Sequence, residues 1–399
     1  MSVNVYESLR SLLDCHPFGC PSSPEIIEIL KILFSEDEAK VALGLGFVPF
    51  TAEEIAQRSG LDLPEVKQRI ESLASKGLVF AREKDGVWKY ALFDTIRLFE
   101  NPFRKGGHDE TIDKLIPLTR QYATTKGKSF NSPTSVFRII PIQEKIESIS
   151  KVLPYEKVYE MIDRAKSVGI SRCTCRELEQ KCDAPRETCM IFDATCDFLV
   201  GRGFARYLTK EEMKHKVHEF AKAGLVLQVN NTQDKLHFIC SCCPCCCIVL
   251  RAFKNYGNPR MLTRSAFKPI RIPENCAGCG TCAEVRCPMG AISIVDKTPV
   301  MNIDLCIGCG LCVTGCPNNA IRLEKEIEVP EPPANEQEMG LRILQARGKL
   351  LDFAKVITPK GKSPLIIYSL MLFLSNPSVQ WLSNSYKKIR GIVMDQKIL

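Results

Sequence analysis

The stretch NCAGCGTCAEVRCPMGAISI, residues 275–294, determines how the cysteine-rich part of this chain folds, and it recurs thirty residues later as LCIGCGLCVTGCPNNAIRL, residues 305–323. Each copy has four cysteines, a proline directly after the fourth, and an Ala-Ile pair that begins a predicted strand. Because the copies share this pattern, they predict two structural halves related by a pseudo-twofold axis. The eight cysteines are Cys276, Cys279, Cys282 and Cys287 in the first copy, and Cys306, Cys309, Cys312 and Cys316 in the second.

The spacing of the second copy, C-x2-C-x2-C-x3-C-P, is the one that bacterial ferredoxins use for [4Fe-4S] clusters. A glycine-containing loop turns the first three thiolates toward one centre, whereas the fourth lies on the following helix and reaches the other cluster. A zinc ribbon is the alternative, but zinc sites use paired C-x2-C units without a third cysteine and a proline. One cluster is therefore expected on Cys276, Cys279, Cys282 and Cys316, and the other on Cys306, Cys309, Cys312 and Cys287.

The first copy departs from the ferredoxin spacing by one residue. Four residues, 283–286, separate Cys282 from Cys287, where the ferredoxin pattern has three. We expect a one-residue bulge that reorients Cys287 without removing it as a ligand, so that the two clusters are not equivalent.

Two further groups of cysteines lie upstream of the repeat. The first includes a C-x-C pair flanked by Arg172 and Arg176, which can neutralise a thiolate-rich site. The second is the run CSCCPCCC. We interpret both groups as ligands of one or two additional iron-sulfur clusters, and their spacing leaves open whether each group forms its own site or both share one. The candidate ligands are Cys173, Cys175, Cys182, Cys189, Cys240, Cys242, Cys243, Cys245, Cys246 and Cys247.

Three other cysteines have weaker patterns. Cys196 lies seven residues after Cys189 on a predicted helix, and packing in the core is its expected role. Cys15, His16 and Cys20 could bind a metal ion, although lone thiols near an N-terminus are more often without a ligand.

Composition favours a reducing compartment and metal-bound thiols. The chain has 21 cysteines, and its N-terminus lacks the basic and apolar segments of a signal peptide, so we expect a cytoplasmic location. Cysteines in that compartment are metal ligands more often than disulfides. The formal net charge of +8 counts every thiol as neutral. Two clusters with roughly two negative charges each lower the net charge to about +4, so the basic balance is weak support for a polyanionic partner.

The 399 residues predict an α+β chain with several domains. Their expected bounds are a winged-helix-like domain at 1–105, a connector with one strand and one helix at 106–165, a cysteine-rich α/β region at 166–262, a two-cluster ferredoxin-like domain at 263–325, and a linker with a helical tail at 326–399.

The first of these domains is predicted from helix and turn signals. A helix opens at Pro24 and covers residues 24–46; the next begins with a capping box formed by Thr51 and Glu54. A third helix spans residues 63–76, and a hairpin turns at Asp85-Gly86. This order resembles a winged helix-turn-helix domain. Residues 51–90 nevertheless carry seven acidic and seven basic side chains, whereas a DNA-reading domain has a clear positive excess.

The middle of the chain predicts further elements around the cysteines. We expect a helix at 111–125 followed by a flexible polar stretch, a strand at 135–142, and an amphipathic helix at 153–169 that ends at the first cysteine group. A second capping box opens a helix at 210–226, before a strand that leads to the second group. Residues 324–340, rich in glutamate and proline, predict an exposed linker.

The combination of a winged-helix start, a C-x-C pair, a CCxCCC run and a dicluster repeat resembles ferredoxin-like 4Fe-4S binding proteins of anaerobes. That resemblance implies cluster binding and electron transfer, with an oxidoreductase or another ferredoxin as redox partner. It names no substrate.

Two alternative functions stay open. The chain could be a redox-responsive transcription regulator that uses the winged helix, with DNA as a partner. It could also be a reductase with a catalytic cluster near Cys240, although no Gly-rich dinucleotide fingerprint or P-loop is present. Both are less favoured than an electron-transfer protein or an electron-carrying component of an oxidoreductase.

The C-terminal tail is a candidate contact surface. Its longest apolar run, residues 365–374, is far shorter than the roughly 20 residues that span a bilayer. A basic segment with Trp381 and Lys387 follows that run. Packing on the core is the ordinary explanation, and a peripheral membrane or subunit contact is the alternative.

Overall fold

The computed structural model describes residues 4–107, 109–142, 156–325 and 330–375. The chain divides into two compact units, which are described separately. The first comprises Met1–Thr134, Gly201–Phe204 and Gln337–Leu399, and the second comprises Ser135–Val200 and Ala205–Glu336. The C-terminal helices therefore group with the N-terminal residues, although they are distant in sequence.

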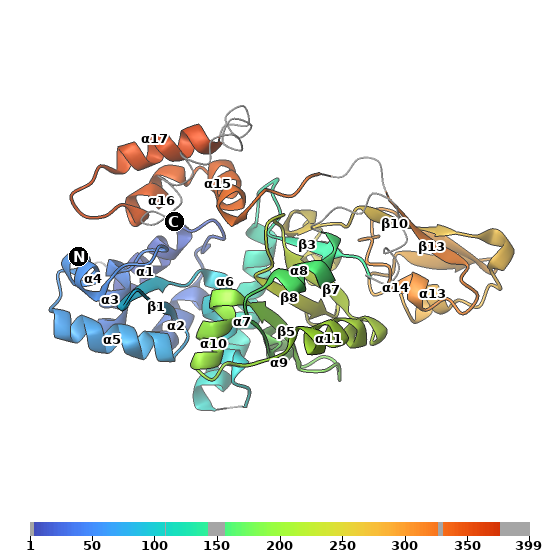
Figure 1. Ribbon diagram of the computed structural model, residues 1–399, viewed down its shortest axis with the longest axis horizontal. Coiled ribbons are helices and arrows are strands. Elements are labelled where there is room, and N and C mark those ends of the chain that lie inside the picture. The colour runs from blue at the N-terminus through green and yellow to red at the C-terminus, as the bar shows by residue number, and fades with distance from the viewer. Residues whose placement is uncertain (1–3, 108, 143–155, 326–329, 376–399) are drawn as a thin grey trace. The chain divides into compact units, whose positions relative to one another are not determined.

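The first unit is largely helical (Figure 1). Its elements are α1 (Val5–Asp14), α2 (Pro24–Leu33), α3 (Glu36–Gly44), α4 (Ala52–Ser59), α5 (Leu63–Ser75), β1 (Val79–Lys84), β2 (Val87–Leu92), α6 (Thr95–Arg104), α7 (Glu110–Ser129), α15 (Glu336–Ala346, which begins at the boundary of the units), α16 (Leu350–Ile357) and α17 (Pro364–Ser375).

Local signals explain most of these boundaries. The predicted capping box of Thr51 and Glu54 is confirmed at the start of α4, and Gly60 ends that helix in the left-handed conformation. Asp85 and Gly86 have φ values of 54° and 76°, as a tight turn between β1 and β2 requires.

Two expectations for this unit are wrong. The segment 24–46 is not one helix, because Ser35 caps a new helix, α3, through a capping box with Glu38. The stretch after residue 125 is not a flexible connection, because α7 continues to Ser129. The buried side chain of Tyr122 anchors that helix, and its hydroxyl donates to the carbonyl of Pro21 at 3.1 Å.

The second unit contains a seven-stranded sheet in the order β6-β4-β5-β8-β7-β3-β9, antiparallel except for the pair β3 and β9. Helices α8 and α11 supply buried side chains to the core on the sheet (Figure 1). The elements are β3 (Phe137–Ile140), α8 (Val158–Arg164), β4 (Val168–Arg172), α9 (Thr174–Glu179), β5 (Glu187–Phe192), α10 (Asp193–Gly201, which ends at the boundary of the units), β6 (Ala205–Tyr207), α11 (Lys210–Lys222), β7 (Val226–Asn230), β8 (Phe238–Cys242), α12 (Ile248–Asn255) and β9 (Leu262–Thr263).

The repeated cysteine stretches form a module within this second unit, which we call the ferredoxin-like module (residues 263–325). Strand β10 pairs with β13, and β11 pairs with β12, both antiparallel. The Ala-Ile pairs begin β11 and β13, as the repeat predicts. The elements are β10 (Phe267–Arg271), α13 (Thr281–Glu284), β11 (Ile292–Val295), β12 (Thr298–Met301), α14 (Leu311–Thr314) and β13 (Ile321–Lys325).

Several sequence expectations for the second unit need correction. The helix expected to reach Gly169 ends at Arg164, and Gly169 lies in β4. Cys189 lies on strand β5, so it does not share a helix with the buried Cys196 of α10. The helix expected to run to residue 226 ends at Lys222, and Val226 begins β7.

The proline-rich linker also differs from its prediction where the structure describes it. Pro332 and Pro333 are buried rather than exposed, and their carbonyls accept hydrogen bonds from Gln233 at 2.6 and 3.0 Å. This part of the linker therefore packs within the second unit.

No helix in the described part of the chain is both long enough and apolar enough to cross a membrane. The tail around Trp381 and Lys387 lies outside the described residues.

Candidate metal centres

The two cysteine loops of the ferredoxin-like module depend on glycines. Gly278, Gly280, Gly308 and Gly310 all have φ between 67° and 78°, in the left-handed region that side chains avoid. Gly308 also has no room for a side chain, since a Cβ on this residue would lie 2.2 Å from the carbonyl oxygen of Phe267. The glycines therefore let each loop curl tightly and bring three thiols to one side.

One pocket in this module is lined by four thiols from both copies of the repeat. Cys306, Cys309 and Cys312 come from the second loop, and Cys287 comes from the first copy. Apolar side chains such as Ile307 complete the wall. A pocket lined by four thiols and otherwise by apolar side chains fits a [4Fe-4S] cluster. Thiolates bind the irons of such a cluster, and the exclusion of water influences its reduction potential. We call this site the inner pocket.

The last cysteines of the two copies have the same hydrogen bonds. The backbone N–H of Ala291 donates to Cys287 Sγ at 3.1 Å, and that of Ala320 donates to Cys316 Sγ at 3.2 Å. Both cysteines lie after the short helices α13 and α14 rather than on them, which corrects the expected placement. The extra residue of the first copy is thus absorbed before Cys287 and leaves its local hydrogen bond unchanged.

The two loops differ in their exposure. Burial raises the pKa of the Cys309 thiol to about 12. The backbone carbonyl of Cys309 accepts a hydrogen bond at 3.2 Å from the N–H of Ile142, a residue that follows strand β3. Cys279 is exposed at the equivalent position of the first loop, and a hydrogen bond with the Thr281 hydroxyl lowers its pKa. The loop of Cys306–Cys312 is therefore inner, and the loop of Cys276–Cys282 is outer.

Arg286 connects α11 with α14, two parts of the second unit that are far apart in the sequence. Its guanidinium donates to the carbonyls of Ala221 and Lys222 at the end of α11, at 3.3 and 3.0 Å. It also donates to the carbonyl of Leu311 and the hydroxyl of Thr314, at 3.2 and 2.8 Å. Arg286 belongs to the four-residue spacer, and that irregular spacer is the signal that could have identified it.

The ten upstream cysteines form two sets. Cys182 Sγ lies 3.6 Å from Cys243 Sγ and 3.8 Å from Cys246 Sγ. Together with Cys245, these sulfur atoms all lie within 4.8 Å of one another. We call this set the compact thiol group: Cys182, Cys243, Cys245 and Cys246.

The other six upstream cysteines form a second set, which we call the adjacent thiol group: Cys173, Cys175, Cys189, Cys240, Cys242 and Cys247. Hydrogen bonds from the thiols of Cys175 and Cys242 lower the pKa of Cys247, which directly precedes α12. Gln228 Nε2 lies 3.6 Å from Cys247 Sγ. Cys189 and Cys240 face each other across strands β5 and β8. The two upstream stretches of sequence therefore contribute jointly to both groups.

Arg176 is the buried cation of this region. Its side chain donates to Thr188 Oγ1 at 2.6 Å and to the carbonyl of Ser241 at 2.5 Å. Burial lowers the pKa of Arg176, but the neighbouring thiols of both groups raise it overall. Arg172, by contrast, donates to Glu177 Oε1 at 2.8 Å. Only Arg176 of the two arginines therefore has the contacts expected of a thiolate partner.

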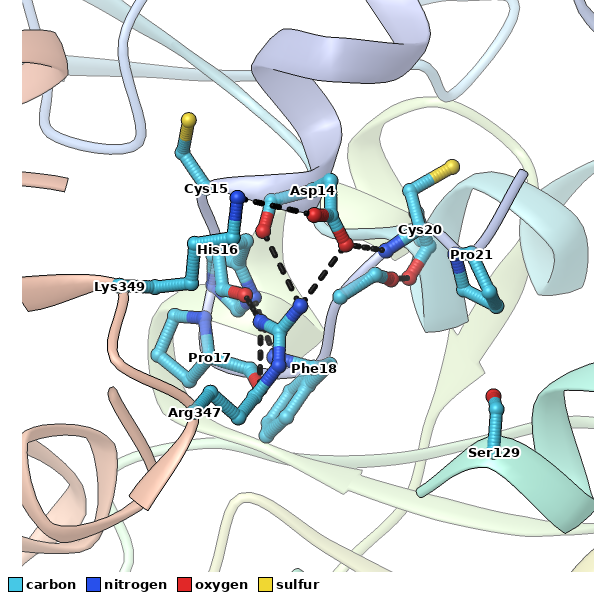
Figure 2. A network of polar contacts seen from close by, with 12 residues as sticks. Asp14, Cys15, His16, Pro17, Phe18, Cys20, Pro21, Ser129, Arg347 and Lys349 are labelled. Atoms are coloured by element: carbon cyan, nitrogen blue, oxygen red, sulfur yellow. Dashed lines mark hydrogen bonds and ion pairs between the residues drawn. The ribbon is translucent and has the colours of Figure 1, made fainter. Parts of the chain in front are cut away.

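The N-terminal candidate does not assemble a metal site. The side chains of Cys15 and Cys20 do not converge, and their sulfur atoms lie on opposite sides of Asp14 in Figure 2. Arg347 donates to Asp14 Oδ1 at 2.8 Å and organises the loop between the two cysteines. Burial raises the pKa of Cys20 to about 11, as expected of a core thiol.

Comparison with known proteins agrees with the geometry of the ferredoxin-like module. Residues 275–321 match the family described as 4Fe-4S dicluster domain. An uncharacterised ferredoxin of Methanocaldococcus jannaschii is 35% identical over 107 residues, which are 25% of this chain and 61% of that protein. The chain thus spans less than two thirds of that relative. A second uncharacterised ferredoxin of the same organism is 36% identical over 58 residues, 14% of this chain and 38% of that protein.

The pyruvate synthase subunit PorD of Methanothermobacter marburgensis is also similar. It is 40% identical over 60 residues, which are 15% of this chain and 69% of that subunit. Two [4Fe-4S] clusters are therefore the cofactors of the ferredoxin-like module, which acts as a ferredoxin-type iron-sulfur electron carrier.

Proposed function

Because the chain belongs to the 4Fe-4S dicluster family through residues 275–321, we propose that it takes single electrons from a redox partner protein at the outer loop and passes them inward through the inner pocket. When bound, the two clusters supply one-electron transfer. The observation that carries the proposal is the difference in exposure between Cys279, which is exposed, and Cys309, which is half-buried; the two occupy equivalent places in the repeat.

The chain's own residues support this direction. The exposed Cys279 loop leaves room for a partner protein to approach, and electron transfer needs short separation between donor and acceptor. The inner loop is attached to the sheet by the Ile142 hydrogen bond and by Ser265, whose backbone N–H donates to the Ile307 carbonyl at 3.2 Å. The ligand sets of this proposal are those of the repeat: Cys276, Cys279, Cys282 and Cys316 for the outer cluster, and Cys306, Cys309, Cys312 and Cys287 for the inner one.

The test is reduction of the full-length protein by a small two-cluster bacterial ferredoxin in rapid-mixing experiments under anaerobic conditions. We expect Cys279→Ala to slow reduction of the inner cluster at least tenfold. Cys196→Ala is the control, since its buried thiol lies outside every candidate ligand set. An unchanged rate in Cys279→Ala would show that electrons enter elsewhere.

We also propose that the chain is the electron-carrying component of an oxidoreductase. The similarity to a pyruvate synthase subunit supports this role. The exposed apolar side chains of α17, among them Leu365 and Ile366, support a subunit contact through the C-terminal helices. Co-purification of the untruncated chain with a stoichiometric oxidoreductase tests the role, and a monomer active with free ferredoxin would contradict it.

The adjacent thiol group supports a further cluster in the same pathway. Its thiols are close enough to perturb one another's pKa values, as Cys175 and Cys242 do for Cys247. If a substrate is reduced at this cluster, the chain is a reductase with a catalytic cluster near Cys240. If the cluster only relays electrons, the chain is a carrier. Cyanide as an added ligand distinguishes the two, because it should alter the EPR spectrum of a cluster with an open iron and leave a fully ligated carrier unchanged.

For the N-terminal residues we propose a winged-helix-like scaffold or docking domain rather than a DNA reader. The order α3, α4, α5 and the β1–β2 hairpin supports the winged-helix comparison. The equal numbers of acids and bases in residues 51–90 argue against DNA, which is bound mainly by positive charge. A salt-dependent gel shift with the full-length protein tests this, and sequence-specific retardation would favour a redox-responsive regulator.

A cytoplasmic location completes the proposal. All 21 cysteines lie in the described part of the chain, and none of them forms a disulfide there. Thiols persist in that form in a reducing compartment.

A further inference from the structure

The compact thiol group has the dimensions of a site for one metal ion. Around a single tetrahedral ion with metal–sulfur bonds of about 2.3 Å, neighbouring sulfur atoms lie roughly 3.8 Å apart. The observed Sγ–Sγ distances from Cys182 are 3.6 Å to Cys243 and 3.8 Å to Cys246, and the whole set lies within 4.8 Å. The four sulfur atoms therefore already surround a point where one ion fits.

An iron-sulfur cubane needs a wider arrangement. Each of its four thiolates binds a different iron at a different corner, so the cluster itself separates the sulfur atoms. The cysteines of the ferredoxin-like module can be compared with the compact thiol group in the spacing of their sulfur atoms. Of the groups of cysteine, histidine and acidic residues in the described part of the chain, the compact thiol group is the one whose potential ligand atoms all lie within 4.8 Å. The four cysteines of the inner pocket do not form such a group.

We propose that the compact thiol group binds one mononuclear tetrahedral ion, zinc or ferrous iron, instead of an iron-sulfur cluster. This inference goes beyond the proposed electron transfer and does not depend on it. Both ions accept four thiolates, and both are soft enough to select sulfur over oxygen ligands.

The surroundings of the group suit a thiolate site. Cys243 and Cys246 are buried, whereas Cys182 and Cys245 are half-buried and pack against the same core. Four thiolates and a divalent ion leave about two negative charges, and the buried Arg176 guanidinium beside Cys243 offsets part of that charge.

The four protein ligands leave no open position on such an ion, and closed zinc sites of this kind are structural. Cys182 belongs to the segment between α9 and β5, whereas the other three ligands lie on the turn between β8 and α12. The ion would therefore fasten together two segments 61 residues apart. A structural tie of this kind argues against catalysis at the compact thiol group itself.

The experiment is metal and sulfide analysis of the full-length protein purified anaerobically. We compare wild type, the double variant Cys182→Ser/Cys245→Ser, and Cys196→Ala as the matched cysteine control. The expected result is that the double variant loses about one zinc or one iron per chain while its acid-labile sulfide stays at the wild-type level. The control should lose neither.

Two results would overturn the inference. A loss of about four irons with four sulfides would assign a cubane to the compact thiol group. Unchanged zinc and iron contents would mean that the group binds no metal. The EPR spectrum of the reduced ferredoxin clusters, recorded on the same samples, tests the proposed function separately.

A second measurement decides the question if the double variant does not fold. X-ray absorption at the zinc edge of wild-type protein should show four sulfur neighbours at about 2.3 Å and no iron neighbour. If the ion is iron, the oxidised protein should have the high-spin ferric EPR signal of a tetrathiolate site. Wild-type protein with neither feature would overturn the inference.

Discussion

The inner pocket and the compact thiol group each gather four cysteines, yet they are suited to different metal chemistry. In the inner pocket, Cys287 joins three cysteines spaced along a glycine-rich loop, and the four thiols line a largely apolar pocket. In the compact thiol group, three ligands lie within four consecutive residues and Cys182 closes the set from the other side. Ligand spacing and backbone shape, rather than the number of thiols, therefore decide whether a cluster or a single ion fits.

The largest expected effect separates the two sites by their iron content. Cys306→Ala/Cys309→Ala should remove about four irons and four sulfides per chain, because two of the four inner-pocket ligands disappear. Iron and sulfide counting measures the loss, and EPR should show one reduced cluster without magnetic coupling to a second. Retention of all the iron would break the assignment of these cysteines to the inner pocket.

A second effect separates the two sites by stability. Losing the ion of the compact thiol group should lower the Tm of Cys182→Ser/Cys245→Ser by on the order of 10 °C, because metal binding contributes directly to folding free energy. The reduced clusters of the ferredoxin-like module should keep their EPR spectrum. Cys196→Ala is again the control in calorimetry. An equal fall in its Tm would mean that the loss of stability comes from removing a buried cysteine and not from losing the ion.

A smaller effect tests the backbone of the inner loop. Gly308→Ala combines a φ of +70° with a Cβ that would lie 2.2 Å from both Phe267 O and Ser265 Oγ. We expect a cost of about 2–3 kcal/mol in stability and incomplete iron loading of the inner pocket, with the compact site fully loaded. Gly201→Ala serves as the comparison, since its Cβ would meet nothing within 4 Å. Full iron content in Gly308→Ala would show that the loop tolerates the side chain.

The smallest effect concerns the cation next to the ferredoxin-like module. Arg286→Met removes a positive charge and four hydrogen bonds beside α14, so the reduced, more negative state of the inner cluster should become less favourable. Its midpoint potential in an EPR-monitored titration should therefore shift to a more negative value. Arg322→Met, which changes an exposed arginine on β13, should shift it less. Equal shifts would mean that the position of Arg286 has no special influence.

Sequence alone predicts one site much better than the other. Local spacing predicts ligand sets for the eight cysteines of the repeat, because each glycine loop sets the positions of its own three thiols. The compact thiol group depends on the pairing of β5 with β8, which brings Cys182 to a turn 61 residues away. No local pattern encodes that pairing, so the partition of the upstream cysteines stayed open until the fold was known.

The fold was predictable to a similar degree. Capping boxes such as that of Thr51 located helix starts correctly, whereas helix ends were overestimated at Arg164 and Lys222. Residues 165–167, which include Lys166 and Ser167, separate the first helix from β4, and Gly224, with a φ of 78°, lies between the second helix and β7. Both turns are short, and the apolar residues of the following strand were included in the predicted helix. The bridging role of Arg286 was also hidden, since two of its carbonyl partners come from the end of α11, more than sixty residues earlier.

The division of the compact ligands between two segments also sets an order of events during synthesis. Cys182 leaves the ribosome well before Cys243, Cys245 and Cys246, which emerge almost together on one short turn. That turn can hold an ion weakly with three thiolates, but tight capture requires the Cys189–Cys240 strand pair to come into register first. Only chains in which β5 and β8 are correctly paired would then retain the ion. A chain in which these strands are misaligned would be purified without it.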